Sequence, residues 1–485
     1  MSSAPISLVD EVGLILANLA ESATGGLVPT VRLGVTGLSR AGKTVFITAL
    51  VHALINGVRL PGFAAQAEGR LIGAALDEHP ERHVPRFAYE QHIATLTGAD
   101  PVWPDSTRRI SQIRLTLKYQ SARWIAGMMG PGEVHLDIVD YPGEWLLDLP
   151  LLSLGFAEWS EIALTRAARL DSEAAAKPFF QELSGMDATS PADETTVERI
   201  AGAFAAYLRA ARAEAQAMST LTPGRFLMPG DLEGSPALTF APLPAPNGPV
   251  GHKSLYRMFE RRYEAYKHVV VQPFFRDHFA RLDRQIVLVD VLKPLNAGAG
   301  AVADLETALS DILACFRQGS GSLLSGIVAR RIDRILFAAS KADHIHHTSH
   351  DRLDAILNRL VARAGRRARF AGAETRSLAM AAVRATREGR ISHDGSPLDV
   401  IIGTPEAGER LDGAEYDGRT EIALFPGDLP ETPEQALSRD GDAPLVNFMR
   451  FRPPSKLGRT DDGLPVLPHI RLDRAVDFLI GDKLR

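Results

Sequence analysis

The sequence predicts an α/β fold with a doubly wound, mainly parallel β-sheet, and three observations support this prediction. Short apolar runs rich in β-branched residues alternate along the chain with segments of helical periodicity, as in repeated βαβ units. The first run, residues 31–36, breaks into a glycine-containing loop that leads directly into an apolar helix. Several later runs end in polar residues, and sheets of this kind bind ligands at the carboxyl ends of their strands.

The loop after the first predicted strand, residues 37–44, matches the phosphate-binding pattern G-x-x-x-x-G-K-[ST] at every fixed position. Gly37 and Gly42 allow the backbone to curl tightly, so that main-chain N–H groups and the helix N-terminus face a phosphate chain. Lys43 is expected to reach the β- and γ-phosphates and Thr44 to ligate Mg²⁺. The expected phosphate contacts are Gly37, Ser39, Arg40, Ala41, Gly42, Lys43, Thr44 and Val45.

Composition favours a globular cytoplasmic protein. Of 485 residues, 45% are hydrophobic and 23% are charged, which is ordinary for a globular chain. The net charge of −5 gives no support to nucleic-acid binding, and the single cysteine excludes an intrachain disulfide and fits a reducing compartment. A position at a membrane surface is the alternative location.

The N-terminal segment, residues 1–22, contains no Lys or Arg and so does not resemble a secretory signal. No run in the chain reaches the roughly 18 apolar residues of a membrane-spanning helix. The pattern over residues 6–19 instead predicts an amphipathic helix. We expect it to dock on the protein's own body; a position on a membrane surface is the alternative.

The order of the predicted elements indicates a discontinuous core domain. Residues 151–283 are helical in pattern apart from a proline- and glycine-rich span, and residues 396–485 mix short strand-like pieces with turns before a closing helix. We expect strands at residues 31–36, 110–119, 134–139, 286–291, 335–339 and 377–383, and mixed, partly helical structure at 57–105. The predicted domains are a core of residues 1–150 and 284–395, a helical cap of 151–283 and a small α+β extension of 396–485.

Two more segments are expected to complete the phosphate site. The predicted strand at residues 134–139 leads into Asp140, and Gly143 follows in the pattern D-x-x-G. Such an Asp can hold the Mg²⁺ shell and such a Gly can offer its N–H to a γ-phosphate, although an ordinary turn has the same composition. Ser106 and Thr107 precede the second strand of the sheet, where a metal-sensing hydroxyl is needed. The predicted metal ligands are Thr44, Thr107 and Asp140.

Catalytic roles are predicted for residues beside the γ-phosphate. Glu144 could orient or deprotonate a water molecule, but its charge would repel the phosphate. Arg108 is the first candidate for an arginine finger, with Arg109 and Arg40 as alternatives, and a solvated charge is the ordinary role of each. The predicted catalytic residues are Lys43, Thr107, Glu144 and Arg108.

A base-reading element follows the predicted strand at residues 335–339. Ser340-Lys341-Ala342-Asp343 resembles the guanine-reading pattern [NT]-K-x-D. A carboxylate can accept hydrogen bonds from both N1–H and the exocyclic N2–H of guanine, whereas adenine lacks this pair of donors, and a Lys stem can lie along the base plane. Around the base we expect Lys341, Asp343, His344, Ala382 and Val383, and also Trp103, for which packing in a core is the alternative.

Four histidines, His344, His346, His347 and His350, follow one another closely after this element. Metal binding would require convergent geometry that a single loop rarely provides, so we do not predict a metal site from them. His344 is instead expected beside the nucleotide.

Taken together, the chain resembles the YcjX family of bacterial P-loop GTP-binding proteins over nearly its whole length. The likeness is carried by GLSRAGKTVF, VDYPGEW, LVDVLKPLN, ASKADH and AAVRAT, and by the later segments TEIALFPGDLP, FMRFRPP and LPHIRLDRAVDFLIGDKL. The resemblance implies a Ras-like G domain with an inserted all-helical cap and a C-terminal extension. It also implies a stress-related role and an inner-membrane protein partner. The chain departs from the usual pattern at Ser340 and at Glu144, where Gln is usual.

We therefore predict a Mg²⁺-dependent protein that binds GTP and GDP, hydrolyses GTP slowly and acts as a switch. Two alternatives stay open: an ATP-binding ATPase or kinase, and a non-hydrolysing nucleotide-bound scaffold for a membrane protein.

Overall fold

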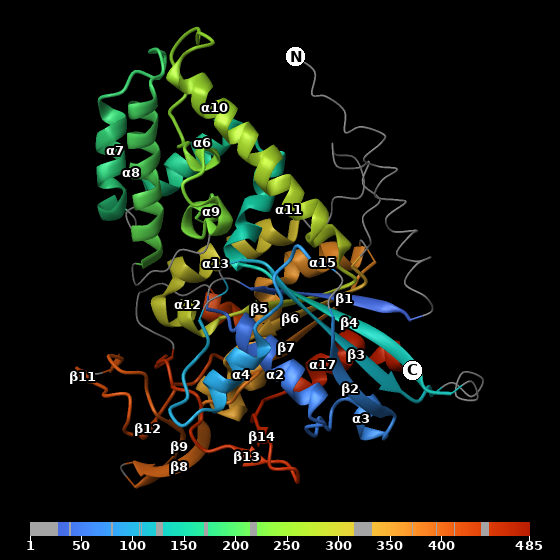
Figure 1. Ribbon diagram of the computed structural model, residues 1–485. Coiled ribbons are helices and arrows are strands. Elements are labelled where there is room, and N and C mark those ends of the chain that lie inside the picture. Colours follow the sequence, from blue (N-terminus) through green and yellow to red (C-terminus); the bar gives the residue numbers. More distant parts are fainter. Residues whose placement is uncertain are drawn as a thin grey trace.

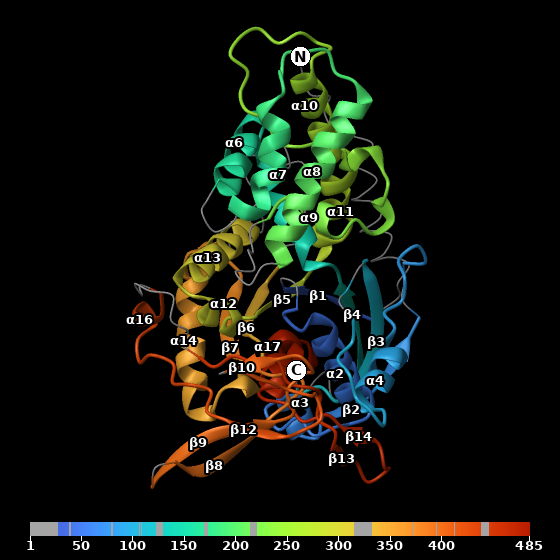
Figure 2. The same ribbon diagram turned by 90° about the vertical axis from the view of Figure 1, so that its left-hand side faces the viewer.

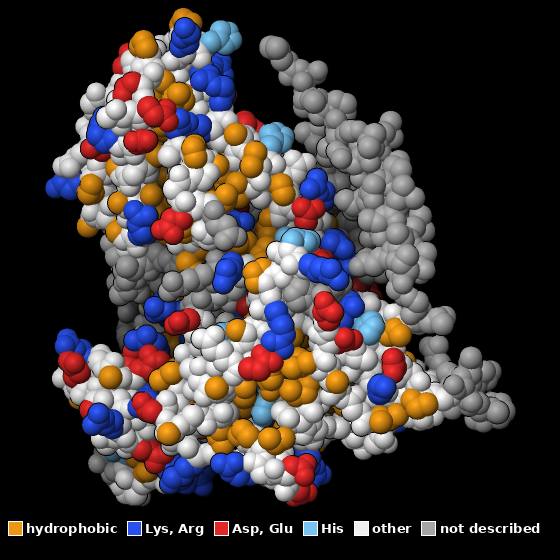
Figure 3. Space-filling model, in the orientation of Figure 1, with side chains coloured by type: hydrophobic (Ala, Val, Ile, Leu, Met, Phe, Trp, Pro, Cys, Tyr) orange, Lys and Arg blue, Asp and Glu red, His pale blue; other side chains and the backbone are white. Residues whose placement is uncertain are grey.

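The computed structural model describes residues 28–37, 40–78, 81–105, 107, 109–122, 130–168, 173–213, 221–314, 332–370, 372–393, 395–411, 413–437 and 446–485. The expected helix over residues 6–19 lies outside these ranges. No helix of the described part is long and apolar enough to cross a membrane. Figure 3 shows acidic and basic side chains interspersed over one face of the molecule.

A seven-stranded sheet forms the centre of the protein, in the order β2-β3-β4-β1-β5-β6-β7 (Figure 1). Strands β1, β4, β5, β6 and β7 are parallel to their neighbours in this series, while β3 is antiparallel to both β2 and β4. The mainly parallel sheet confirms the predicted fold class. The strands span Thr30–Gly37 (β1), Leu71–Asp77 (β2), Ser111–Tyr119 (β3), Gly132–Asp140 (β4), Arg284–Val289 (β5), Arg334–Ala339 (β6) and Glu374–Ala379 (β7).

Helices cover both faces of this sheet because successive side chains of a strand point to opposite faces. In β5, Ile286 and Leu288 pack in the same core as α2 (Lys43–Ile55) and the closing helix α17 (Leu472–Ile480). Val287 and Val289 belong to the core on the other face, with α13 (Ala299–Ala314) and α14 (His350–Leu360). Further helices are α3 (Ala64–Ala67), α4 (Tyr89–Thr97), α12 (Leu292–Ala297) and α15 (Ala362–Phe370).

A helical body lies between β4 and β5 in the sequence and beyond the end of the sheet in space (Figure 2). Its core is aromatic: the Trp159 and Tyr263 rings stack with centroids 4.9 Å apart, and Phe240 packs edge-on against Trp159. Its elements are η1 (Gly143–Ser153), α6 (Phe156–Ala167), α7 (Glu173–Ser184), α8 (Glu194–Ala213), α9 (Gly224–Leu227), η3 (Gly230–Leu232), η4 (Pro236–Leu238), α10 (Leu255–Tyr266), the π-helical η5 (Lys267–Val271), α11 (Gln272–Asp277) and η6 (Phe279–Arg281).

A smaller β-rich part follows β7. It contains a three-stranded antiparallel sheet in the order β12-β9-β8 and two short hairpins, and Figure 2 shows the three-stranded sheet beyond the end of the main sheet opposite to the helical body. Its elements are β8 (Arg387–His393), β9 (Ser396–Gly403), β10 (Arg410–Leu411), β11 (Ala414–Glu415), β12 (Ile422–Leu424), α16 (Pro433–Leu437), β13 (Gly458–Arg459) and β14 (Pro465–Val466). The chain then returns to the main sheet, where Arg284 of β5 donates a 3.1 Å hydrogen bond to the Leu479 carbonyl of α17.

Three predictions about strands were wrong in detail. Strand β2 lies in the region predicted as mixed and partly helical; its sequence LIGAALD is apolar but contains a glycine and two alanines and does not alternate with polar residues, so it lacks a strand signal. Strand β7 ends at Ala379 rather than Val383, because the chain turns away there and Ala381 pairs with Ile470. The polar strand β8 was not predicted at all.

Candidate nucleotide-binding site

A cavity of about 430 Å³ opens at the carboxyl ends of the parallel strands. Four segments that are distant in sequence form most of its lining: the loop after β1, residues 103–105 with Thr107, the residues after β6, and those after β7. Lys43 and Asp343 both belong to its lining. The pocket thus lies where a doubly wound sheet places its ligands.

The loop after β1 has the backbone that a phosphate cradle requires. Gly42 has a φ of +89°, in the left-handed region that favours glycine, and α2 begins at the next residue, Lys43. At Gly37, a Cβ atom would lie 2.7 Å from the carbonyl oxygen of Leu288, so only glycine lets these strands approach so closely. The buried Lys43 Nζ donates a 2.9 Å hydrogen bond to the Gly37 carbonyl, which holds the ammonium group inside the loop.

The predicted metal ligands converge beside this loop. The Thr107 hydroxyl donates a 2.8 Å hydrogen bond to Asp140 Oδ2 and lies 3.2 Å from the Thr44 hydroxyl. Burial raises the pKa of Asp140 to about 6, although the charge of Lys43 and the Thr107 hydrogen bond act in the opposite direction. Asp140 Oδ1 is buried and has no hydrogen-bond partner among the described residues. Two hydroxyls and a carboxylate with a spare oxygen fit the hard-oxygen shell of Mg²⁺.

At the other end of the cavity, Asp343 is buried and ionised. Burial opposes its ionisation, but the charge and hydrogen bond of His344 and the Ala385 N–H together hold its pKa below the usual value. The Ala385 N–H donates to Asp343 Oδ2 at 2.7 Å, and His344 Nδ1 lies 3.3 Å from Oδ1. A fixed carboxylate is therefore presented in the pocket. Lys341 pairs with Asp290 at 2.5 Å.

The β-rich part supplies lining residues that sequence reasoning missed: Glu406, Arg450 and Phe451. Trp103 Nε1 donates a 2.7 Å hydrogen bond to the Phe451 carbonyl, and the His344 ring lies 5.4 Å from the Phe451 ring. In the sequence, Arg450 and Phe451 stood out only as part of FMRFRPP, one of the segments that carry the family resemblance. That motif gave no chemical reason to place them at the pocket.

Most of the predicted site residues lie around this one cavity. Three predicted residues lie beside the cavity without lining it. The Gly37 carbonyl accepts a hydrogen bond from Lys43, and the Asp140 carboxylate accepts one from Thr107, and both donors line the cavity. Gly143 is buried at the start of η1. Ser39, Ser106 and Arg108 lie outside the described residues. Those that line the cavity are Arg40, Ala41, Gly42, Lys43, Thr44, Val45, Trp103, Thr107, Glu144, Lys341, Asp343, His344, Ala382 and Val383.

The helical body contacts the site through η1, which follows Gly143. Glu144 lines the cavity with its side chain almost fully buried, and its carbonyl oxygen lies against Gly224 of α9. One residue on, the Trp145 indole donates a 3.0 Å hydrogen bond to the Met228 carbonyl, and the Arg225 guanidinium lies 3.1 Å from the centre of its ring. The loop that follows Asp140 is thus held directly by the helical body.

The sheet and the phosphate-type loop define an α/β protein of the P-loop NTPase class. The chain belongs to the family described as YcjX-like family, DUF463, whose model matches residues 31–484. A relative from Escherichia coli K12, named Ras-like GTPase YcjX, is 39% identical over 468 residues, which cover 94% of this chain and 96% of the relative. A relative of the same name from Shewanella oneidensis MR-1 is 35% identical over 473 residues, covering 93% and 94% of the two chains.

Proposed function

We propose that this protein is a Mg²⁺-dependent GTP-binding protein that hydrolyses GTP slowly and acts as a nucleotide-dependent switch. The observation that carries the proposal is the position of Lys43 and Asp343 at one cavity. The first residue suits the β- and γ-phosphates, and the second suits the paired N–H donors of guanine. Two relatives that align over nearly the whole chain carry the name Ras-like GTPase, which supports the guanine nucleotide over an adenine nucleotide.

In this proposal Mg²⁺ is held by the Thr44 and Thr107 hydroxyls and by the free oxygen of Asp140. When bound, the ion would neutralise charge on the β- and γ-phosphates. The chain's own contributions are the ammonium group of Lys43, the main-chain N–H groups of the loop, and the exclusion of water by the buried walls of the site.

We expect slow hydrolysis because Glu144, an acidic residue, would lie beside the γ-phosphate. Glu144 can orient a water molecule, but its carboxylate repels the phosphate in the ground state and in the transition state. We therefore expect a low intrinsic rate, with Arg40 of the cavity lining and Arg108 as the candidates to offset this charge. The stress-related role and the inner-membrane partner implied by the family resemblance stay predictions.

A base-exchange experiment tests the guanine assignment. Xanthine has a carbonyl group at C2 where guanine has an amino group, so an amide at position 343 should favour it. We expect Asp343→Asn to weaken GTP binding at least tenfold and to strengthen binding of xanthosine triphosphate, whereas Asp428→Asn, outside the cavity lining, should change neither. Equal losses for both nucleotides with a correctly folded variant would remove Asp343 from the base site.

Phosphate release separates a slow enzyme from a scaffold that holds nucleotide without turnover. We expect the wild-type protein to release phosphate from GTP in the presence of Mg²⁺ and Lys43→Ala to lose this activity. Equal rates for the two proteins would contradict the enzymatic part of the proposal while leaving the binding part to the base-exchange experiment.

A further inference from the structure

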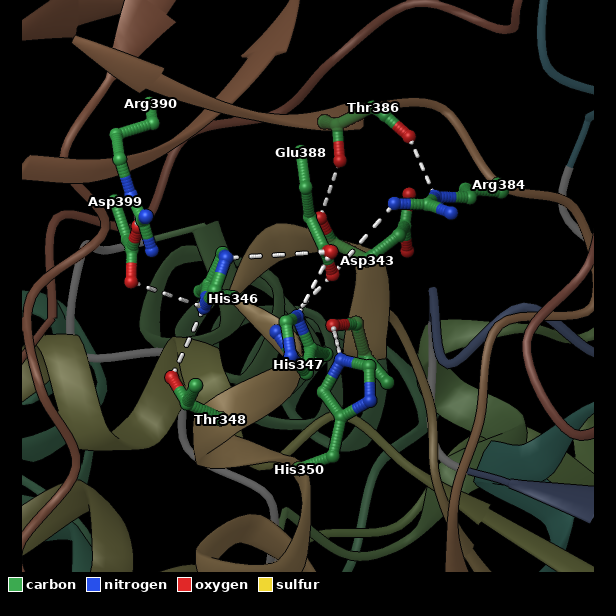
Figure 4. A network of polar contacts seen from close by, with 11 residues as sticks. Asp343, His346, His347, Thr348, His350, Arg384, Thr386, Glu388, Arg390 and Asp399 are labelled. Atoms are coloured by element: carbon green, nitrogen blue, oxygen red, sulfur yellow. Dashed lines mark hydrogen bonds and ion pairs between the residues drawn. The ribbon is translucent and has the colours of Figure 1, made fainter.

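A second cluster of ligand-type side chains lies outside the nucleotide cavity, where strand β8 meets the loop after Asp343 (Figure 4). Its members are His346, His347 and Glu388, and Asp399 of β9 lies next to them. The loop alone would not form a site, since the carboxylate comes from a strand about forty residues further along the chain. The histidine loop by itself gave no reason to expect a metal site, and strand β8 brings Glu388 next to it as a third ligand.

The three side chains face one another at distances that suit one ion. His347 Nδ1 lies 2.8 Å and His346 Nε2 4.0 Å from the same oxygen, Glu388 Oε2, and the three ligand atoms all lie within 4.8 Å of one another. In a tetrahedral shell with zinc bonds of 2.0–2.1 Å, ligand atoms lie about 3.4 Å apart. Small rotations of these side chains would therefore place all three atoms around a metal.

The opposite atoms of the same side chains are held as in known metal sites. His346 Nδ1 lies 3.0 Å from the Thr348 hydroxyl and 4.0 Å from Asp399 Oδ2, while the main-chain N–H of His347 donates a 3.1 Å hydrogen bond to Glu388 Oε1. Metal-binding histidines usually donate their second ring N–H to an oxygen, and the binding carboxylates are themselves hydrogen-bonded. Each outer contact leaves the inner atom, His346 Nε2 or Glu388 Oε2, directed at the shared position.

The types of ligand indicate the class of ion, and the exposure of the side chains indicates how the ion could enter. Two imidazoles with one carboxylate favour zinc and related transition metals over Ca²⁺ or Mg²⁺, which prefer oxygen ligands. The His346 side chain is 12% exposed and Glu388 28%, whereas His347 is 62% exposed, so an ion could enter from that side. Arg384 lies 3.6 Å from the other carboxylate oxygen, Glu388 Oε1, and its charge would lower the affinity for a cation.

We propose that His346 Nε2, His347 Nδ1 and the Glu388 carboxylate bind one divalent transition-metal ion of the zinc class, and that the Thr348 hydroxyl orients His346. The ion would fasten β8 to the loop that carries the base-reading residue. The two residues directly before β8 already contact Asp343, because the Ala385 N–H donates to its carboxylate and the Thr386 hydroxyl donates to its carbonyl. The site would thus stabilise the position of Asp343, and its existence does not depend on the proposed nucleotide.

Calorimetric titration of the chelator-treated full-length protein with Zn²⁺ tests this site. Excess Mg²⁺ is included so that the oxygen-rich site near Asp140 does not take up zinc. We expect one strongly bound Zn²⁺ per chain, and at least tenfold weaker binding in His347→Ala and in Glu388→Gln. The matched control is His393→Ala, an exposed histidine on the same strand outside the cluster, which should bind as the wild type does.

His347 is sufficiently exposed that its removal should leave the fold intact, and a circular dichroism spectrum verifies this for each variant. Co²⁺ provides a second measurement, because its visible absorption reports ligation by imidazole and should disappear in His347→Ala. Absence of zinc binding by the wild-type protein, or equal affinity in the wild type, His347→Ala and Glu388→Gln, would overturn the proposal.

Discussion

The main-chain N–H of Gly224 donates a 2.7 Å hydrogen bond to the buried carboxylate of Asp148. The two residues join α9 of the helical body to η1, the segment that begins directly after the Asp140 loop. The same carboxylate accepts a 2.6 Å hydrogen bond from the Tyr266 hydroxyl and a 3.2 Å bond from the Arg225 N–H. A displacement of η1 by the γ-phosphate would therefore be transmitted to α9 and α10, the other helices of the body at this junction, which gives the proposed switch a physical path.

Gly224→Ala should disrupt this junction. A Cβ atom at Gly224 would lie 1.8 Å from the carbonyl oxygen of Glu144, so one of the two backbones must shift. We expect a loss of about 1–3 kcal/mol in the free energy of unfolding, measured by chemical denaturation. The control is Gly202→Ala on α8, where a Cβ atom meets nothing within 4 Å and should stabilise by about 0.5–1 kcal/mol. Similar effects of the two substitutions would show that the contact is not tight.

Asp140→Asn should stabilise the nucleotide-free protein while weakening nucleotide binding. The pKa of Asp140 rises from 3.8 to about 6 on folding, mainly through burial, so the folded protein holds this proton more tightly than the unfolded chain. Its contribution to stability is therefore present at low pH and is lost as the pH rises through about 6. At pH 8 we expect the variant to gain up to about 3 kcal/mol.

Thermal unfolding at several pH values checks this gain, which should shrink toward pH 5. In the presence of Mg²⁺ and GDP the wild type should instead be the more stable protein, because the variant lacks the carboxylate that would hold the ion. A variant that is less stable than the wild type at pH 8 without nucleotide would contradict the electrostatic assignment.

Thr107→Ala should reduce the Mg²⁺ dependence of GTP binding. It removes one of the two hydroxyls proposed to hold the ion and the 2.8 Å hydrogen bond to Asp140. We expect the ratio of GTP affinities with Mg²⁺ and with EDTA to fall about tenfold, because the lost interaction involves the metal rather than the base. Thr95→Ala, whose hydroxyl donates to the Gln91 carbonyl of its own helix, is the control. An unchanged ratio would place the metal elsewhere.

Arg284→Met tests whether the closing helix is part of the sheet core. The Arg284 side chain is 1% exposed, and it pairs with Asp482 at 2.7 Å and with Asp333. We expect a loss of about 1–3 kcal/mol in unfolding free energy, because the Leu479 carbonyl of α17 loses a buried hydrogen bond and Asp482 loses its charged partner. The exposed pair of Arg410 and Glu415 offers the comparison: Arg410→Met should cost less than about 1 kcal/mol. Equal costs would indicate that α17 contributes little.

The sequence predicted the sheet because its parallel strands are buried on both faces and read as continuous apolar runs, as in residues 286–289 and 335–339. Motifs on the ends of these strands then placed Lys43, Asp140 and Asp343 at one edge. Strand β8 was missed because it is exposed and polar, and β2 was missed because its apolar run of Leu, Ile, Gly and Ala does not alternate with polar residues.

The contribution of the β-rich part to the cavity could not be predicted for a different reason. Phe451 and Arg450 reach the pocket through long-range contacts, such as the bond from Trp103 to the Phe451 carbonyl, which no local pattern encodes. The contact between His347 and Glu388 could not be predicted either, because Glu388 lies on β8, a strand that was not predicted.

The central claim is that one cavity binds a guanosine phosphate between Lys43 and Asp343. Equilibrium titration of the wild-type protein with fluorescent GDP and fluorescent ADP, both in the presence of Mg²⁺, tests it most directly. The account predicts that GDP binds at least a hundredfold more tightly than ADP, and that Lys43→Ala weakens the binding of GDP. Equal affinities for the two nucleotides, or tighter binding of ADP, would contradict it.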